Sequence, residues 1–238
     1  MGLPVSLLAR GAVDGGDVDR AAASAFAALR DADLLLSPYR EDSEVSRLAR
    51  GDRFAPHPDT VEVRRLVDEA RLRTGGLFDA TRPDGTWDPS GLVKGWAVER
   101  AGRHLTGPAV DWCLNAGGDV LVLSRSGEPF VVGVEDPLDP SRLIASVPVG
   151  IGGVATSGTY ARGRHLYDPR TGAAAEDVAS VTVVGPSLMW ADVLATAAFV
   201  AGEAALALVS GHPGYTALVV RTDGTSEASV AWPGTLLA

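Results

Sequence analysis

The order of helical and strand-like segments is the feature that most constrains the fold of this 238-residue chain. Some segments carry apolar residues at helical spacing, whereas others are short apolar runs bounded by Gly, Pro and Asp. The two kinds are interspersed without the strand–helix–strand alternation of a doubly wound sheet, which favours an α+β fold with mixed sheets and packed helices. The predicted helices are 17–36, 60–74, 90–105, 189–201 and 203–210, and the predicted strands are 5–9, 110–114, 120–124, 129–135, 143–147, 151–155, 179–185 and 215–221.

No internal repeat, low-complexity linker or shift in composition divides the chain, so we expect one domain over residues 1–238. Lys and Arg total 21 against 30 Asp and Glu, a formal net charge of −9. That balance argues against a nucleic-acid partner, because phosphate backbones are usually bound by a basic face. The single cysteine, Cys113, excludes an intramolecular disulfide and a Cys-rich zinc site. Lys94 is the only lysine among the 21 basic residues, so one position carries the sole ammonium side chain.

The termini and apolar runs predict a cytoplasmic protein. Residues 1–8 lack the basic start and long apolar run of a signal peptide, and no lipobox cysteine is present. The longest apolar stretch, residues 191–201, is interrupted by Asp192 and Thr196 and is too short to span a bilayer. We therefore expect no stable membrane insertion, although an exported form with its leader removed would carry the same sequence.

Four separated segments combine glycine with polar or aromatic residues at unusual density. In the first, residues 37–46, Ser43 and its acidic neighbours can cap a short following helix, while Tyr39 can pack on a flat ligand ring. The second, residues 75–81, begins with paired glycines that can end a helix or let the backbone approach a ligand closely. Both interpretations stay open for each segment.

The third segment, residues 88–96, leads into a predicted helix with Gly91, Lys94 and Gly95 in its first turns. A helix N-terminus attracts anions, and Lys94 would add a point charge there. Gly95 costs about 1 kcal/mol relative to Ala inside a helix, which indicates a packing or ligand reason for its presence. A solvated lysine is the alternative for Lys94.

The fourth feature joins residues 156–172 to residues 191–196. The first part holds hydroxyl, imidazole and carboxylate groups, including Ser157 and His165, within a short stretch. In the second part Asp192 and Thr196 are spaced i and i+4, on one helix face. A carboxylate with a hydroxyl and backbone carbonyls suits Mg²⁺, whereas a helix-terminal charge and a back-bonded threonine are the alternative.

A further stretch, residues 115–119, contains Gly117, Gly118 and Asp119 between two predicted strands, and fits either a hairpin turn or a ligand-facing loop.

Taken in order, these segments resemble the ApbE family, the FAD:protein FMN transferases. The resemblance implies an α+β fold that binds FAD and Mg²⁺. It also implies a reaction in which FMN moves from FAD to a Thr or Ser hydroxyl of an acceptor protein, with release of AMP. The stretches that carry it are SPYREDSEVSRL, GGLFDAT, DPSGLVKGWAVERA, LNAGGDVLV, ATSGTYAR, HLYDPRTG and ADVLATAAFVAG.

The resemblance also implies residue roles. Asp192 and Thr196 match the metal-ligating side chains, Gly91 and Ala195 match positions that offer carbonyls to the metal, and His165 matches a histidine suited to handling the hydroxyl proton. Either His165 or a carboxylate near the metal is the base, and Asp192 is counted with His165 as catalytic. With Mg²⁺, Lys94 is expected to supply the local positive charge for FAD. The residues expected to contact FAD are Tyr39, Leu77, Phe78, Asp79, Asp88, Lys94, Gly117, Gly118, Asp119, Ser157 and Tyr167.

Three positions depart from the family pattern. Leu3 stands where Thr is usual, Glu99 stands where Asp is common, and only six residues separate Thr81 from Asp88 where relatives carry a longer connection. The short connection is expected to open the site or to remove an element that docks the acceptor. The competing hypotheses are a Mg²⁺-dependent FAD pyrophosphatase that yields FMN and AMP, and a non-catalytic flavin-binding protein.

Overall fold

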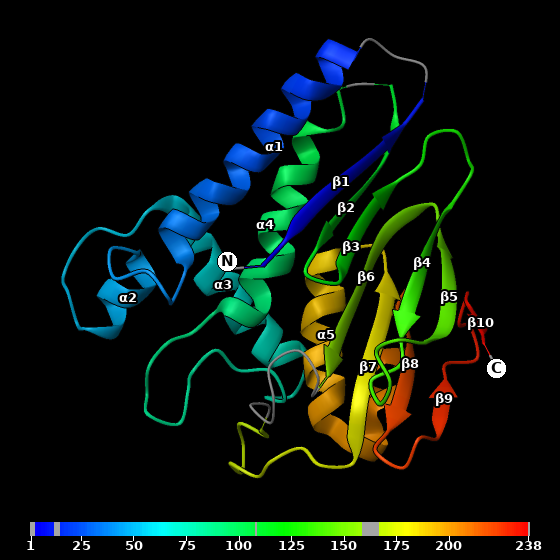
Figure 1. Cartoon of the computed structure of the whole chain (residues 1–238). Helices are drawn as coiled ribbons and strands as arrows, with labels where there is room; N and C mark the ends of the chain where they lie inside the picture. The colour runs from blue at the N-terminus through cyan, green and yellow to red at the C-terminus, as the bar shows by residue number, and fades with distance from the viewer. Residues whose placement is uncertain (1–2, 12–14, 108, 159–166, 238) are drawn as a thin grey trace.

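A seven-stranded sheet forms the middle of three layers in the computed structural model (Figure 1), which describes residues 3–11, 15–107, 109–158 and 167–237. Helices cover one face of this sheet and a three-stranded sheet covers the other. The strand orders are β1-β2-β3-β6-β7-β8-β9 and β10-β5-β4, and every strand pair within the described residues is antiparallel. The predicted α+β class is confirmed.

The elements follow the predicted order closely. The helices are α1 (Gly15–Leu36), α2 (Glu44–Ala49), α3 (Pro58–Arg73), α4 (Ser90–His104), α5 (Leu188–Ala201), the 3-10 turn η1 (Gly202–Ala204) and α6 (Ala205–Ser210). The strands are β1 (Val5–Arg10), β2 (Asp111–Ala116), β3 (Asp119–Leu123), β4 (Phe130–Glu135), β5 (Leu143–Val149), β6 (Ile151–Gly158), β7 (Val178–Gly185), β8 (Thr216–Arg221), β9 (Ser226–Ala228) and β10 (Thr235–Leu236).

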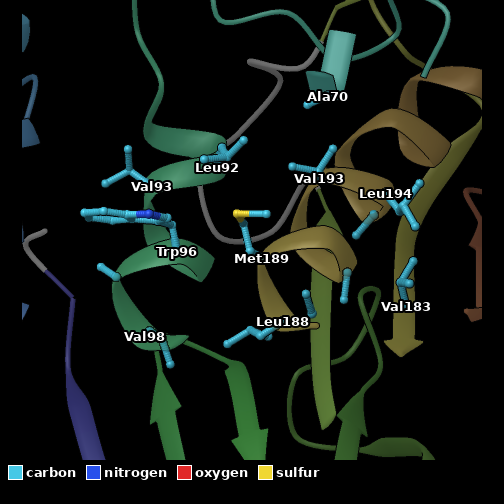
Figure 2. Packing of buried hydrophobic residues seen from close by; sticks show 14 of the residues in the cluster. Ala70, Leu92, Val93, Trp96, Val98, Val183, Leu188, Met189, Val193 and Leu194 are labelled. Atoms are coloured by element: carbon cyan, nitrogen blue, oxygen red, sulfur yellow. The ribbon is translucent and has the colours of Figure 1, made fainter. Parts of the chain in front are cut away.

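Alternation along the central strands divides the core in two. On β7, Val181 and Val183 face the helices, whereas Val184 packs on the side of the three-stranded sheet. Successive side chains of a strand point to opposite faces, so one strand supplies both cores. Helix α5 packs against α4 on one side and against β6 and β7 on the other. Figure 2 shows this contact, with Met189 of α5 in the space between the two helices.

Several predicted boundaries are wrong for local reasons. Helix α3 is capped by His57, whose Nδ1 accepts from the Asp59 N–H at 3.2 Å, rather than by Asp59 or Thr60. Pro58 at the first helical position fixes this earlier start, because its missing N–H costs nothing there. Strand β6 continues to Gly158, so Ser157 lies in a strand that pairs with β7 and not in a loop.

The C-terminal end differs as well. The turn η1 precedes α6, which therefore starts two residues later than predicted. Strands β9 and β10 were not predicted, because they are short, largely exposed and lack a repeating apolar face.

The stretch Leu188–Ser210 is long and apolar enough to cross a membrane by length and composition. This is weak evidence for a span, since a core helix has the same composition. In the structure most of α5 is buried against α4 and the central sheet.

Candidate functional site

A cleft of about 1020 Å³ opens where α4, α5, the end of β6 and the β2–β3 turn converge. The size suits a large ligand, since small-molecule sites usually occupy roughly 300–1,000 Å³. Its lining brings together residues predicted from six separate sequence segments. They are Tyr39, Leu77, Phe78, Asp79, Asp88, Gly91, Lys94, Gly117, Ser157, Tyr167, Asp192 and Thr196.

Four predicted site residues are not among these. Gly118, Asp119 and Ala195 do not line the cleft, as far as the described residues define it. Asp119 and Ala195 are buried. His165 lies outside the described residues, so its proposed role in proton transfer stays a prediction.

Lys94 lies between two buried carboxylates. Its Nζ is 2.6 Å from Asp119 Oδ2 and 3.4 Å from Asp192 Oδ1. Asp119 is 1% exposed at the start of β3, and Asp192 is 2% exposed in the second turn of α5. We refer to these three residues as the Lys94 cluster.

The Lys94 cluster is a feature that the sequence did not predict. The ammonium of Lys94, expected to supply positive charge for an anionic ligand, also contacts the carboxylates of Asp119 and Asp192. Buried charges are stabilised by such pairing, so Lys94 helps to hold the Asp192 carboxylate at the wall of the cleft. The contact of Lys94 with FAD stays a prediction.

Asp192 and Thr196 share one face of α5, as their spacing predicts, and both line the cleft. Thr196 Oγ1 lies 3.1 Å from Ser157 Oγ at the end of β6. Asp192 is one turn inside the helix, which begins at Leu188, so its position is not that of a simple N-terminal helix charge.

Mg²⁺ requires hard oxygen donors such as carboxylates and carbonyls. Within the described residues, no group of three or more His, Cys, Asp or Glu side chains could hold a metal. The carboxylate of Asp192 and the hydroxyl of Thr196 are nevertheless hard oxygen donors at the wall of the cleft, which is the donor chemistry Mg²⁺ prefers. The residues present therefore fit the predicted ion, with water and ligand oxygens completing its shell.

Apolar and aromatic groups form another wall of the cleft. Leu77 and Phe78 are buried, and Tyr39 is 77% exposed at the rim. A Cβ on Gly91 would lie 3.2 Å from Phe78 Cε2, so glycine lets the first turn of α4 approach that ring. Burial raises the pKa of Tyr167 above its usual value, so its phenol stays protonated at neutral pH. A smaller, mostly apolar recess opens beside Tyr39.

Asp79 and Asp88 shape the short connection between residues 81 and 88. Asp79 Oδ1 accepts from the Thr81 N–H at 2.8 Å, and Asp88 Oδ1 accepts from the Ser90 N–H at 3.0 Å. Each carboxylate also pairs with an arginine: Arg71 Nε lies 2.9 Å from Asp79 Oδ2, and Arg82 contacts Asp88. Both residues therefore line the cleft and also hold the turns that frame it.

Residues 115–119 were expected to form either a hairpin turn or a ligand-facing loop, and the structure shows a part of each. Gly117 and Gly118 have φ of 62° and 98°, which identifies a two-residue hairpin turn between β2 and β3. Gly117 lines the cleft. The hairpin also places Asp119 beside Lys94.

Sequence reasoning did not identify Glu99 and Ser187 as residues that set the site's geometry. Glu99 Oε1 accepts from Ser187 Oγ at 2.7 Å and from the Met189 N–H at 3.1 Å. Ser187 is the N-cap of α5. Its position just before an apolar helix was the available signal, but no sequence pattern pairs it with Glu99.

A model of the ApbE family matches residues 81–219. The chain belongs to the ApbE family. That span includes most of the cleft, from the short connection at residue 81 through the metal-type donors of α5.

Curated relatives carry the name FAD:protein FMN transferase. The chain is 29% identical over 191 residues to the one from Vibrio cholerae, covering 74% of this chain and 57% of that protein. It is 34% identical over 164 residues to the one from Treponema pallidum, covering 60% and 45%. The chain thus spans about half the length of the curated relatives it matches.

Solved structures support the fold. The ApbE protein of Thermotoga maritima superposes with a TM-score of 0.84 at 23% identity, covering 96% of this chain and 94% of that one. The flavin transferase ApbE from Vibrio cholerae gives 0.78 at 24% identity, covering 96% and 98%. At these identities the likeness concerns the fold, and the whole architecture is shared.

Proposed function

We propose that this chain is a Mg²⁺-dependent FAD:protein FMN transferase that moves FMN from FAD to a Thr or Ser hydroxyl of an acceptor protein and releases AMP. The oxygen donors of α5 carry the proposal: the carboxylate of Asp192 and the hydroxyl of Thr196 line the cleft where an anionic dinucleotide would lie, and both suit Mg²⁺. The names of the curated relatives support the same activity.

The cleft residues divide between binding the flavin and binding the metal. Leu77, Phe78 and Tyr39 present apolar and aromatic surface to a flat ring, which gains packing from such contacts. Asp192 and Thr196 would hold Mg²⁺, with carbonyls of Gly91 and Ala195 as predicted further donors. When bound, Mg²⁺ neutralises phosphate charge and stabilises a departing phosphate.

In the proposed reaction the acceptor oxygen forms a bond to the flavin-bearing phosphorus as the pyrophosphate P–O bond breaks. AMP departs with the bridging oxygen, and the hydroxyl proton passes to a base, for which His165 is the predicted residue. The rest of the protein's contribution is positioning, because phosphoryl transfer needs little covalent help.

The proposal is tested by incubating the chain with FAD, Mg²⁺ and a candidate acceptor domain, and then measuring the intact mass of the acceptor. If the chain is a transferase, each acceptor molecule gains one covalently bound FMN, and AMP is formed. Free FMN with an unmodified acceptor would instead identify an FAD pyrophosphatase, and unchanged FAD would identify a flavin-binding protein.

A further inference from the structure

Helices α4 and α5 meet backbone to backbone at one point. A Cβ on Gly95 of α4 would lie 2.6 Å from Met189 Cα, far inside ordinary contact. On the opposite side of the same turn of α5, a Cβ on Gly153 of β6 would lie 2.6 Å from Leu188 Cα. Of the two reasons predicted for Gly95, the structure shows the packing one. The first turn of α5 is held between α4 and β6.

Glu99 joins the two helices one turn further along α4. Its Oε1 accepts from Ser187 Oγ and from the Met189 N–H, while Ser187 Oγ in turn accepts from the Trp190 N–H at 3.2 Å. Two free N–H groups at the start of α5 are thereby satisfied. A carboxylate at this end also complements the helix dipole.

Close packing at glycine sets how near two helices come, but apolar contacts allow sliding along the axes. Directional hydrogen bonds to Glu99 restrict that sliding. Lys94 is the neighbour of Gly95, and Asp192 lies one turn beyond Leu188. The α4–α5 contact therefore sets the positions of both site residues relative to each other. The 3.4 Å separation of Lys94 Nζ and Asp192 Oδ1 depends on this register.

We propose that Glu99 is a positioning residue for the metal site. It does not line the cleft as the described residues form it. It acts by fixing the register of α5 against α4, which aims Asp192 and Thr196 at the ion. This inference rests on the proposed function, because it requires that Asp192 and Thr196 bind Mg²⁺.

A set of three variants of the full chain tests the role. Glu99→Ala removes both acceptor bonds, Glu99→Gln keeps an oxygen that can accept them, and Glu203→Ala is the control because Glu203 is exposed at the far end of α5. The readout is the Mg²⁺ concentration that gives half-maximal change in the fluorescence of FAD added to the protein. Glu99→Ala is expected to raise this concentration about tenfold, as loss of outer ligand-orienting bonds does. Glu99→Gln should stay within about threefold of the parent, since it keeps an acceptor for both bonds.

Thermal unfolding in EDTA separates positioning from stability alone. If Glu99→Ala lowers the unfolding temperature but binds Mg²⁺ as tightly as the parent, the inference is overturned. If Glu99→Ala does not fold, Ser187→Ala replaces it, and unchanged Mg²⁺ affinity in that variant overturns the inference equally. A parent protein whose FAD fluorescence ignores Mg²⁺ contradicts the proposed metal site itself, which is a different result from insensitivity of the variants.

Discussion

Two buried carboxylates stand at the two ends of the β2–β3 hairpin, and their surroundings differ. Asp111, at the start of β2, accepts from Ser126 Oγ at 2.5 Å, from the Arg125 N–H at 2.6 Å and from Arg10 Nε at 3.1 Å. Asp119, at the start of β3, lies beside Lys94, which also contacts Asp192. The donors of Asp111 lie away from the cleft, whereas Asp119 contacts an ammonium that lines the cleft and also contacts Asp192.

The difference separates a structural carboxylate from one that is linked to the cleft. The turn after β3 supplies the Ser126 and Arg125 donors of Asp111, and these bonds hold that turn in place. Asp119 instead contacts Lys94, which lines the cleft together with Asp192. Burial alone therefore does not distinguish the two ends; the location of the partner does.

The largest effect is expected from Asp192→Ala. Loss of this carboxylate should lower Mg²⁺-dependent FMN transfer by about 10³-fold, the scale seen when one charge-stabilising group is removed from an active site. The assay is FMN incorporated into the acceptor over time. Asp31→Ala, on the exposed face of α1, is the matched control, and full activity in Asp192→Ala would reject Asp192 as a ligand.

A pair of substitutions compares the two ends of the hairpin directly. Lys94→Met leaves two carboxylates buried without their ammonium, and should reduce the free energy of unfolding by about 3–5 kcal/mol. Arg10→Met removes a partly exposed partner of Asp111, which keeps its other donors, and should cost about 1 kcal/mol or less. Urea unfolding in EDTA measures both, and equal losses would contradict the distinction.

Lys94→Arg tests why this position alone carries lysine. A planar guanidinium cannot take the place of a compact ammonium between Asp119 and Asp192 without shifting them. We expect FAD binding in the presence of Mg²⁺ to weaken by about tenfold, since misplacing a ligand-orienting group has that scale. Binding equal to that of the parent would mean that the single lysine reflects codon usage only.

The smallest effect is expected on how the free energy of unfolding falls at acidic pH. The Ser126 hydroxyl, followed by the Ser126 and Arg125 N–H groups, holds the pKa of Asp111 well below its usual range. A depressed pKa gives stability that is present above the ordinary carboxyl pKa of about 4 and is lost as pH falls below it. Asp111→Asn should therefore flatten the fall in unfolding free energy below about pH 4. If Asp111→Asn leaves the fall in unfolding free energy below about pH 4 unchanged, the lowered pKa of Asp111 is contradicted.

Much of the fold could be predicted because its signals are local. The long helix over α1, the strand β7 and the Gly75–Gly76 helix end all follow from periodicity or from glycine at positive φ, here 61° and 82°. The His57 cap was missed because Pro58 shifted the start of α3. The extension of β6 was missed because pairing with β7, not propensity, continues that strand.

The site was predicted less completely, since its charges come from distant segments. The spacing of Asp192 and Thr196 on one helix face is visible in sequence. The meeting of Asp119, Lys94 and Asp192 is not, because these residues come from β3, α4 and α5, which are brought together only by tertiary packing. For the same reason Lys94 could be identified as unusual, but its two carboxylate neighbours could not.

Mg²⁺ dependence of FAD affinity tests the account most directly. Titration of FAD into the full chain, followed by flavin fluorescence, is repeated in excess Mg²⁺ and in EDTA. Because Asp192 and Thr196, the proposed Mg²⁺ ligands, line the cleft, we expect Mg²⁺ to lower the Kd for FAD by at least about tenfold, a coupling of about 1.4 kcal/mol. Equal affinity in Mg²⁺ and EDTA would contradict the claim that this cleft binds FAD together with a metal ion.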